Sequence, residues 1–327
     1  MKRTTASVLK NAAAVGAALG IQAGVNKALQ TRAGSLTSGL SGTHGAYDWR
    51  LGKIWYSVKG DGPPVLLIHG IGAGASSYEW RRNFDELSNE FRVYAIDLLG
   101  FGLSDRPSMD HSGRFYVQMI DDFIRYVVKQ PANVIASSHS AAYAIRLAFT
   151  RPERVKSLIL VCPVGVGHGS ASAGPLPSMG KAIHLPVVGE SVYNGLVSTT
   201  NVARTLREDL FYDPGQVTDA MVDQYYRTAH QPGARHAVAS FLQGDLNLPV
   251  DNEFKHLKQP ILMVWGAESR YTPLVQARQF QEANGAAVLH VFQQTRQLPH
   301  DEQAGHFNRL VTSWLQPITA DQALRIL

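Results

Sequence analysis

The sequence predicts an α/β protein in which a doubly wound, mostly parallel sheet carries a helical cap insertion. Short all-apolar runs alternate with segments of helical periodicity, as expected of buried parallel strands whose helices cover both faces. The alternation breaks once, across residues 163–256, where Gly and Pro clusters and helical stretches replace strands. With 327 residues, 45% of them hydrophobic, the chain is long enough to bury such a core.

The expected strands are apolar runs of strand length at residues 65–68, 93–96, 134–136, 158–161, 261–265 and 288–292. The expected helices repeat apolar residues at helical spacing over 115–128, 141–149, 273–283 and 302–315. A hairpin of residues 49–50 and 54–58 is expected to precede the first strand of this series. The core is therefore predicted to comprise residues 47–162 and 257–327, with residues 163–256 as the cap.

Residues 1–46 differ from the rest of the chain in charge. The whole excess of +5 comes from five cations that precede the first acidic residue, Asp48: Lys2, Arg3, Lys10, Lys27 and Arg32. From Asp48 onward, 26 Lys and Arg balance 26 Asp and Glu. The body therefore has no net field to attract a polyanion, and we expect no nucleic-acid partner.

The basic segment contains an uncharged stretch, residues 11–26, which would form a helix of roughly 24 Å, short of a roughly 30 Å hydrocarbon core. Gly16, Gly20 and Gly24 share one face of that helix, a spacing that permits close helix approach. We predict that residues 5–29 attach the protein to a membrane or a membrane-protein partner. A cleaved secretory signal and a mobile leader on a cytoplasmic protein are the alternatives. Residues 30–46, rich in Thr, Ser and Gly, are predicted to be a flexible linker.

Two motifs stand where predicted strands end, which is where open α/β sheets place their chemistry. The first is HGIG at residues 69–72, whose Ile71 N–H is the expected oxyanion donor. The second is SHSAA at residues 138–142, between a strand and a helix, with small residues two positions either side of Ser140. This spacing predicts a nucleophile elbow with Ser140 as the nucleophile and the Ala141 N–H as second oxyanion donor. An ordinary strand-to-helix turn with a serine cap is the alternative.

These motifs, together with RPERV at 151–155, WG at 265–266 and PH at 299–300, resemble the α/β-hydrolase-fold superfamily over about residues 47–317. Residues 78–129 are similar to its pheophytinase and epoxide-hydrolase-like branch. The resemblance implies a serine hydrolase of the carboxylic ester class, with a cap that shapes a pocket for an apolar small molecule. No His, Cys or acidic cluster has metal-ligand spacing and no loop has the phosphate-binding pattern, so we expect no metal and no cofactor.

Two positions of the catalytic triad depart from the pattern that the resemblance implies. The acid position holds Ser269, and the histidine position holds Gln297. A serine needs a base to take its proton, so the nearest substitutes are His300 as base and Glu268 as acid. Weaker candidates for the base are the histidines of the predicted cap: His168, His184, His230 and His236.

The sequence leaves two functions open. One is a hydrolase of apolar esters in which Ser140 attacks and His300 replaces the missing base. The other is a catalytically inactive member that binds an apolar ligand or serves as a membrane-attached subunit.

Overall fold

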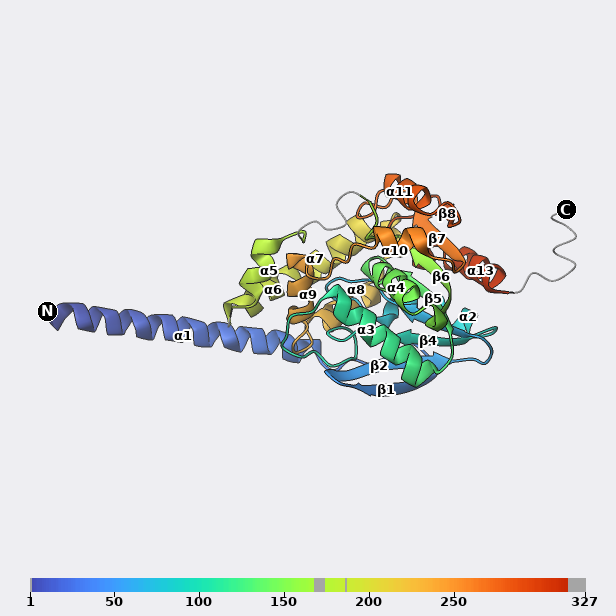
Figure 1. Cartoon of the computed structure of the whole chain (residues 1–327). Helices are drawn as coiled ribbons and strands as arrows, with labels where there is room; N and C mark the ends of the chain where they lie inside the picture. Colours follow the sequence, from blue (N-terminus) through green and yellow to red (C-terminus); the bar gives the residue numbers. More distant parts are fainter. Residues whose placement is uncertain (1, 168–173, 186, 317–327) are drawn as a thin grey trace, which may run out of the picture.

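The computed structural model describes residues 2–167, 174–185 and 187–316 and, in the first helix, the side chains from Gly16 onward. Its centre is an eight-stranded sheet with the strand order β1-β2-β4-β3-β5-β6-β7-β8 (Figure 1). The strands are β1 (Thr43–Trp49), β2 (Gly52–Lys59), β3 (Pro64–Ile68), β4 (Arg92–Ile96), β5 (Ala132–Ser137), β6 (Val155–Val161), β7 (Ile261–Gly266) and β8 (Val288–Phe292). The hairpin β1–β2 is antiparallel, and β2 pairs with β4 in antiparallel register. Strands β3 to β8 all run parallel. The predicted fold class is confirmed.

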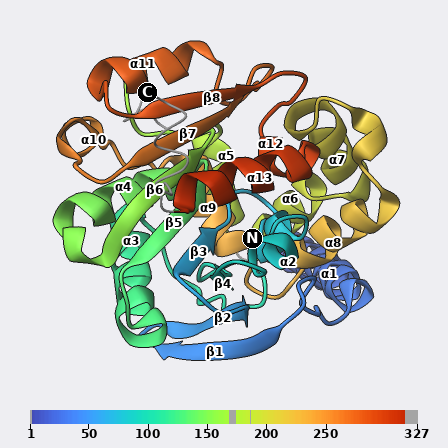
Figure 2. The same cartoon turned by 90° about the vertical axis from the view of Figure 1, so that its right-hand side faces the viewer.

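Helices cover both faces of the sheet because residues along each strand point alternately to the two sides. Leu66 and Ile68 of β3 pack in one apolar cluster, and Val65 and Leu67 pack in another. The first cluster includes side chains of α3 (Gly113–Phe123), α4 (His139–Thr150), α10 (Asp251–His256) and α11 (Val275–Ala283). The second includes side chains of η1 (Ser77–Trp80), α2 (Phe84–Leu87) and α13 (Ala304–Leu315), and α2 and α13 lie together in Figure 2.

Two helices differ from their predicted bounds. The predicted helix 115–128 begins earlier, as α3, and its last turn is the π-helical segment η2 (Ile124–Val128). The predicted helix 302–315 is divided at Gln303 into the short α12 (Pro299–Glu302) and α13. A 3-10 turn, η3 (Pro152–Arg154), leads from α4 into β6.

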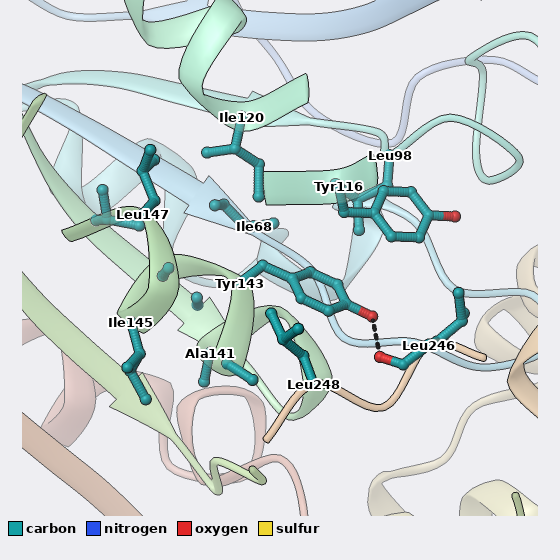
Figure 3. Close-up of a cluster of buried hydrophobic side chains, with 14 of the residues drawn as sticks. Ile68, Leu98, Tyr116, Ile120, Ala141, Tyr143, Ile145, Leu147, Leu246 and Leu248 are labelled. Carbon is teal, nitrogen blue, oxygen red and sulfur yellow. Dashed lines mark hydrogen bonds between the residues drawn. The ribbon is translucent and has the colours of Figure 1, made fainter. Parts of the chain in front are cut away.

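Helical segments form the cap between β6 and β7 in the described part of the chain. They are α5 (Pro177–Ile183), α6 (Val188–Leu196), α7 (Thr199–Arg204), η4 (Thr205–Leu210), η5 (Pro214–Gln216), α8 (Asp219–Ala229) and α9 (Arg235–Gln243). The chain then returns along α4, where Tyr143 Oη donates to Leu246 O at 2.9 Å and Leu248 packs beside it (Figure 3). α10 contacts α4 and α11, so the end of the predicted cap segment packs on the core.

The N-terminal helix α1 (Lys2–Ala33) ends on the cap, while its start projects away from the body (Figure 1). Buried Asn26 donates to Val187 O at 3.2 Å and accepts from Asn194 Nδ2 at 3.0 Å, and Gln30 donates to Glu190 at 2.9 Å. The predicted linker 30–46 is wrong at both ends, because residues 30–33 continue α1 and residues 43–46 belong to β1.

The glycine face of α1 packs on nothing within the described structure. Gly16, Gly20 and Gly24 are exposed, and a Cβ at each would meet no atom within 4 Å. None of the described helices combines the length and the apolar character needed to cross a bilayer. Attachment of residues 5–29 to a membrane or a partner stays a prediction.

Candidate functional site

The sharpest turn of the sheet lies at Ser138, between the end of β5 and the start of α4. Ser138 has φ 53° and ψ −123°, a left-handed conformation that costs a non-glycine residue energy. The small residues Ala136 and Ser140 stand two positions before and after it. Because a strained strand-to-helix turn between small residues defines a nucleophile elbow, the elbow is centred on Ser138.

The predicted elbow at Ser140 is therefore wrong by two residues. Ser140 is fully buried in the first turn of α4, and its Oγ donates to His69 O at 2.6 Å. Its hydroxyl ties the helix to the loop after β3 instead of facing a ligand. Both Ala136–Ser140 and Ser138–Ala142 place small residues around a serine, and only the end of β5 distinguishes them.

The oxyanion donors change with the elbow. The Ala141 N–H donates to Ser138 O at 3.1 Å, so it is occupied. His139 is the first residue of α4, and its N–H has no intrahelical acceptor. The N–H groups of His139 and Ile71 have no acceptor among the described residues, and both residues line the same cavity. The role of Ile71 as an oxyanion donor therefore stays a prediction, and His139 replaces Ala141 as the second candidate donor.

Ser269 and Gln297 are in contact, although 28 positions separate them in sequence. Gln297 Oε1 accepts from Ser269 Oγ at 2.7 Å and from Thr272 Oγ1 at 3.1 Å. This arrangement leaves Gln297 Nε2, which is buried and without a partner in the described part of the chain. Both Gln297 and Ser138 line the cavity. An amide with a free donor thus stands where the resemblance expects an imidazole.

The substitutes proposed for base and acid lie elsewhere. His300 is fully buried with its ring 4.3 Å from that of Trp80, and its Nε2 is 3.3 Å from Glu79 Oε1. Glu268 Oε2 accepts the Thr295 N–H at 3.0 Å and braces that loop. Neither His300 nor Glu268 lines the cavity, so the prediction of this pair as the catalytic dyad is wrong.

The cap histidines also fail to reach the elbow. His184, His230 and His236 are absent from the cavity wall; His230 Nδ1 bonds Tyr226 O at 2.9 Å, and the ring of His236 lies 6.4 Å from that of His184. His168 lies outside the described residues.

One imidazole does lie beside the elbow, that of His139. His139 Nδ1 is 3.3 Å from Ser138 Oγ, and its Nε2 is 3.2 Å from Asn247 Oδ1. Since an amide oxygen can only accept, Nε2 carries the proton and Nδ1 is the free acceptor. Burial lowers the pKa of His139 to about 4, against the opposing effect of the Asn247 bond, so the ring is neutral at pH 7.

The cavity above the elbow has a volume of about 620 Å³. Core loops form its floor, and cap side chains form much of its wall, which is mainly apolar: Leu196, Val202, Leu206, Val238, Phe241 and Leu242. Among the described residues that line the cavity, Glu79 is the only Asp, Glu, Lys or Arg. The described residues include no group of three His, Cys, Asp or Glu side chains that could hold a metal ion.

Comparison with known proteins gives the same family as this geometry. The model of the alpha/beta hydrolase fold family matches residues 63–310. A 2-hydroxy-6-oxo-2,4-heptadienoate hydrolase of Pseudomonas putida is 27% identical over 265 residues, covering 78% of this chain and 90% of its own. A 2-hydroxymuconate semialdehyde hydrolase of Pseudomonas putida is 29% identical, covering 79% of this chain and 88% of its own.

Solved structures of similar fold include members with the same type of name. A mutant of the meta-cleavage product hydrolase CumD is 28% identical, with a TM-score of 0.70 over 82% of this chain and 96% of its own. A membrane phospholipase A covers 96% of this chain and 98% of its own with a TM-score of 0.68, and at 20% identity it shows the fold alone. These names differ from the pheophytinase and epoxide-hydrolase-like branch, which stays a prediction. The elbow at Ser138, the oxyanion loop and the family match together show that the chain belongs to the α/β-hydrolase fold family.

Proposed function

We propose that the protein binds an apolar small molecule through a carbonyl group and does not hydrolyse it by a serine–histidine–acid triad. The observation that carries the proposal is the Gln297–Ser269 hydrogen bond at 2.7 Å, in the place of an imidazole and its carboxylate. A carboxamide cannot take and return a proton at pH 7, so Gln297 can bind and orient but cannot act as a general base.

The wall of the cavity contains several donors that have no acceptor among the described residues. They are the N–H groups of Ile71 and His139 and the Gln297 Nε2 amide. A buried donor without an acceptor costs about 1–3 kcal/mol, and a ligand oxygen removes that cost. The apolar wall adds affinity for the hydrocarbon part of the same molecule. A carbonyl oxygen on an apolar skeleton satisfies both features.

The relatives named above are hydrolases of hydroxy-oxo-dienoates or a muconate semialdehyde. Deletion of the base from a serine triad typically costs several orders of magnitude in turnover, so a chain with Gln297 in that position would catalyse such a reaction slowly.

Binding of 4-phenylbutan-2-one, a neutral ketone with a terminal phenyl group, tests the proposal. Isothermal calorimetry compares the wild type with Gln297→Leu, which removes the amide donor at similar volume, and with Gln281→Leu, whose side chain is exposed on α11. We expect the Gln297 variant to bind about fivefold to tenfold more weakly, the value of roughly one hydrogen bond, and the Gln281 variant to bind like the wild type. Equal affinity in both variants would contradict the proposal.

The contacts of His139 favour a second candidate, a slow serine hydrolase. In that reaction Ser138 Oγ attacks an ester carbonyl carbon while its proton passes to His139 Nδ1, 3.3 Å away, with Asn247 holding the opposite nitrogen. The proton then goes to the departing alcohol, and water cleaves the acyl-serine. Labelling by a fluorophosphonate that is lost in both Ser138→Ala and His139→Gln would establish this candidate. Absence of labelling in the folded wild type would exclude it.

A further inference from the structure

We infer that the cavity selects a neutral carbonyl compound over a carboxylate and that Glu79 is the residue that determines this selection. The inference rests on the proposed function, since it specifies the chemical class of the ligand bound at the same donors.

Glu79 reaches the donor cluster from η1. Its Oε2 accepts the Gly70 N–H at 2.9 Å, directly before the Ile71 donor in sequence. A Cβ placed on Gly70 would lie 3.4 Å from that carboxylate oxygen and 3.5 Å from Ser138 Cβ. The carboxylate and the elbow serine thus lie around the same glycine, and Glu79 belongs to the cavity wall.

The Glu79 carboxyl is ionised at neutral pH. Burial works against its charge, but the neighbouring His300 and the Gly70 N–H together hold the pKa of Glu79 below its ordinary value. His300 faces Oε1 at 3.3 Å and, being absent from the cavity wall, is not available to a ligand. A negative charge therefore stands at the oxyanion loop before any ligand arrives.

His300, which faces Glu79 from outside the cavity, is the nearest group that could offset this charge, and the described wall itself supplies no cation to an incoming anion. No Lys or Arg lines the described wall, and His139, whose pKa burial lowers to about 4, is uncharged at pH 7. Arg81, next to η1, is paired with Asp301 at 2.8 Å. A carboxylate ligand would be desolvated beside a like charge, whereas a ketone or ester oxygen would accept from the same donors without that repulsion.

A pair of ligands that differ in little except charge tests the selection. 4-Phenylbutan-2-one and 3-phenylpropanoate share their skeleton and differ by a methyl group in place of a carboxylate oxygen. Calorimetry at pH 7 gives the two dissociation constants for the wild type, and we expect the ketone to bind at least tenfold more tightly. This ratio needs no variant and tests the inference by itself.

Glu79→Gln then assigns the selection to one residue. The glutamine amide oxygen can still accept the Gly70 N–H, so we expect 3-phenylpropanoate to bind at least tenfold more tightly than to the wild type, with the ketone within threefold. Glu268→Gln is the matched control, because the Glu268 carboxylate also accepts a backbone N–H but lies outside the cavity wall. It should leave both constants unchanged.

The outcomes separate this inference from the proposal on which it rests. If the ketone binds in a Gln297-dependent way and the wild type takes the acid equally well, the inference is overturned and the proposed function stands. If Glu79→Gln leaves the preference for the ketone intact, Glu79 is not its determinant. If neither molecule binds, or if binding ignores Gln297, the proposed function fails and the inference fails with it.

Discussion

At the scale of single residues, Ser138 concentrates the unusual features of the molecule. It is a non-glycine residue in a left-handed conformation, and such strain costs on the order of 1–3 kcal/mol. β5 and α4, both largely buried, impose the turn from either side. Such strain persists where the surrounding structure fixes the backbone, and it commonly marks a functional position.

This strain predicts the order of stability of two substitutions at the elbow. Glycine adopts φ 53° without a Cβ penalty, whereas alanine keeps the penalty. We expect Ser138→Gly to be about 1 kcal/mol more stable than Ser138→Ala in urea unfolding, although glycine gains chain entropy when unfolded. Lys129, a residue with φ 62° after η2, provides the same comparison away from the cavity. An alanine variant at position 138 as stable as the glycine variant would contradict the strained elbow.

The sequence predicted the existence of the elbow but not its register. Small residues flank both Ser138 and Ser140, so local composition does not distinguish them. The end of β5 determines the register, because its ladder with β6 extends to Ser137 and the turn begins at the next residue. The pairing of Gln297 with Ser269 follows from family spacing, but the free amide donor and the position of Glu79 depend on packing between distant segments.

At the scale of elements, α1 docks on the cap through a buried amide, Asn26, together with the Gln30–Glu190 hydrogen bond and the bond from Arg227 to Ala33 O. Asn26 contacts Val187, Ser191 and Asn194, which follow one another along α6 from its N-cap. The exposed face of α1 carries the glycines, so polar side chains, and not the small-residue stripe, hold the helix to the body. Sequence reasoning treated residues 30–46 as a linker because composition does not report such a contact.

Asn26→Ala should release the end of α1. Loss of several hydrogen bonds at about 1 kcal/mol each weakens docking by about 2 kcal/mol. We expect trypsin to cleave at the exposed Arg32 at least tenfold faster in this variant, since cleavage inside a helix requires local unfolding. Val25→Ala, at an exposed neighbouring position, should be cleaved like the wild type. Equal rates in all three proteins would show that Asn26 does not hold the helix.

At the scale of the whole molecule, acid should destabilise the fold through buried neutral histidines. Burial lowers the pKa of His111 to about 4. Between about pH 6.5 and pH 4 the unfolded chain therefore binds a proton that the folded chain does not, and stability falls as pH falls through this window. Glu302, whose pKa burial raises to about 7, contributes in the opposite direction, since its folded form holds the extra proton.

His111→Phe isolates the contribution of one buried ring. His111 packs against Phe115 and Tyr116, so a phenyl group replaces it among aromatic neighbours. Urea unfolding at pH 7 and pH 5 gives the fall in unfolding free energy between the two pH values. We expect this fall to be about 2 kcal/mol smaller in the variant than in the wild type. Comparing the two falls removes the effect of Glu302 and of any loss of stability common to both pH values. An identical fall in both proteins would contradict a neutral His111.

The alternation of apolar runs and helical segments was sufficient to predict the architecture. Each of the six predicted strands lies in the sheet, because an all-apolar run such as 65–68 has few stable alternatives to a buried parallel strand. The division of α12 from α13 and the docking of α1 were not predictable, since both depend on contacts between segments remote in sequence.

The central proposal is that this chain, which has the α/β-hydrolase fold, lacks the histidine base of a serine triad. Restoring the dyad with Ser269→Asp and Gln297→His tests it most directly, with fluorophosphonate labelling of Ser138 as the measurement. We expect labelling at least a hundredfold faster than in the wild type, and its abolition when Ser138→Ala is added. A wild type that is labelled as fast as the restored variant, or a folded restored variant that stays unlabelled, would contradict the account.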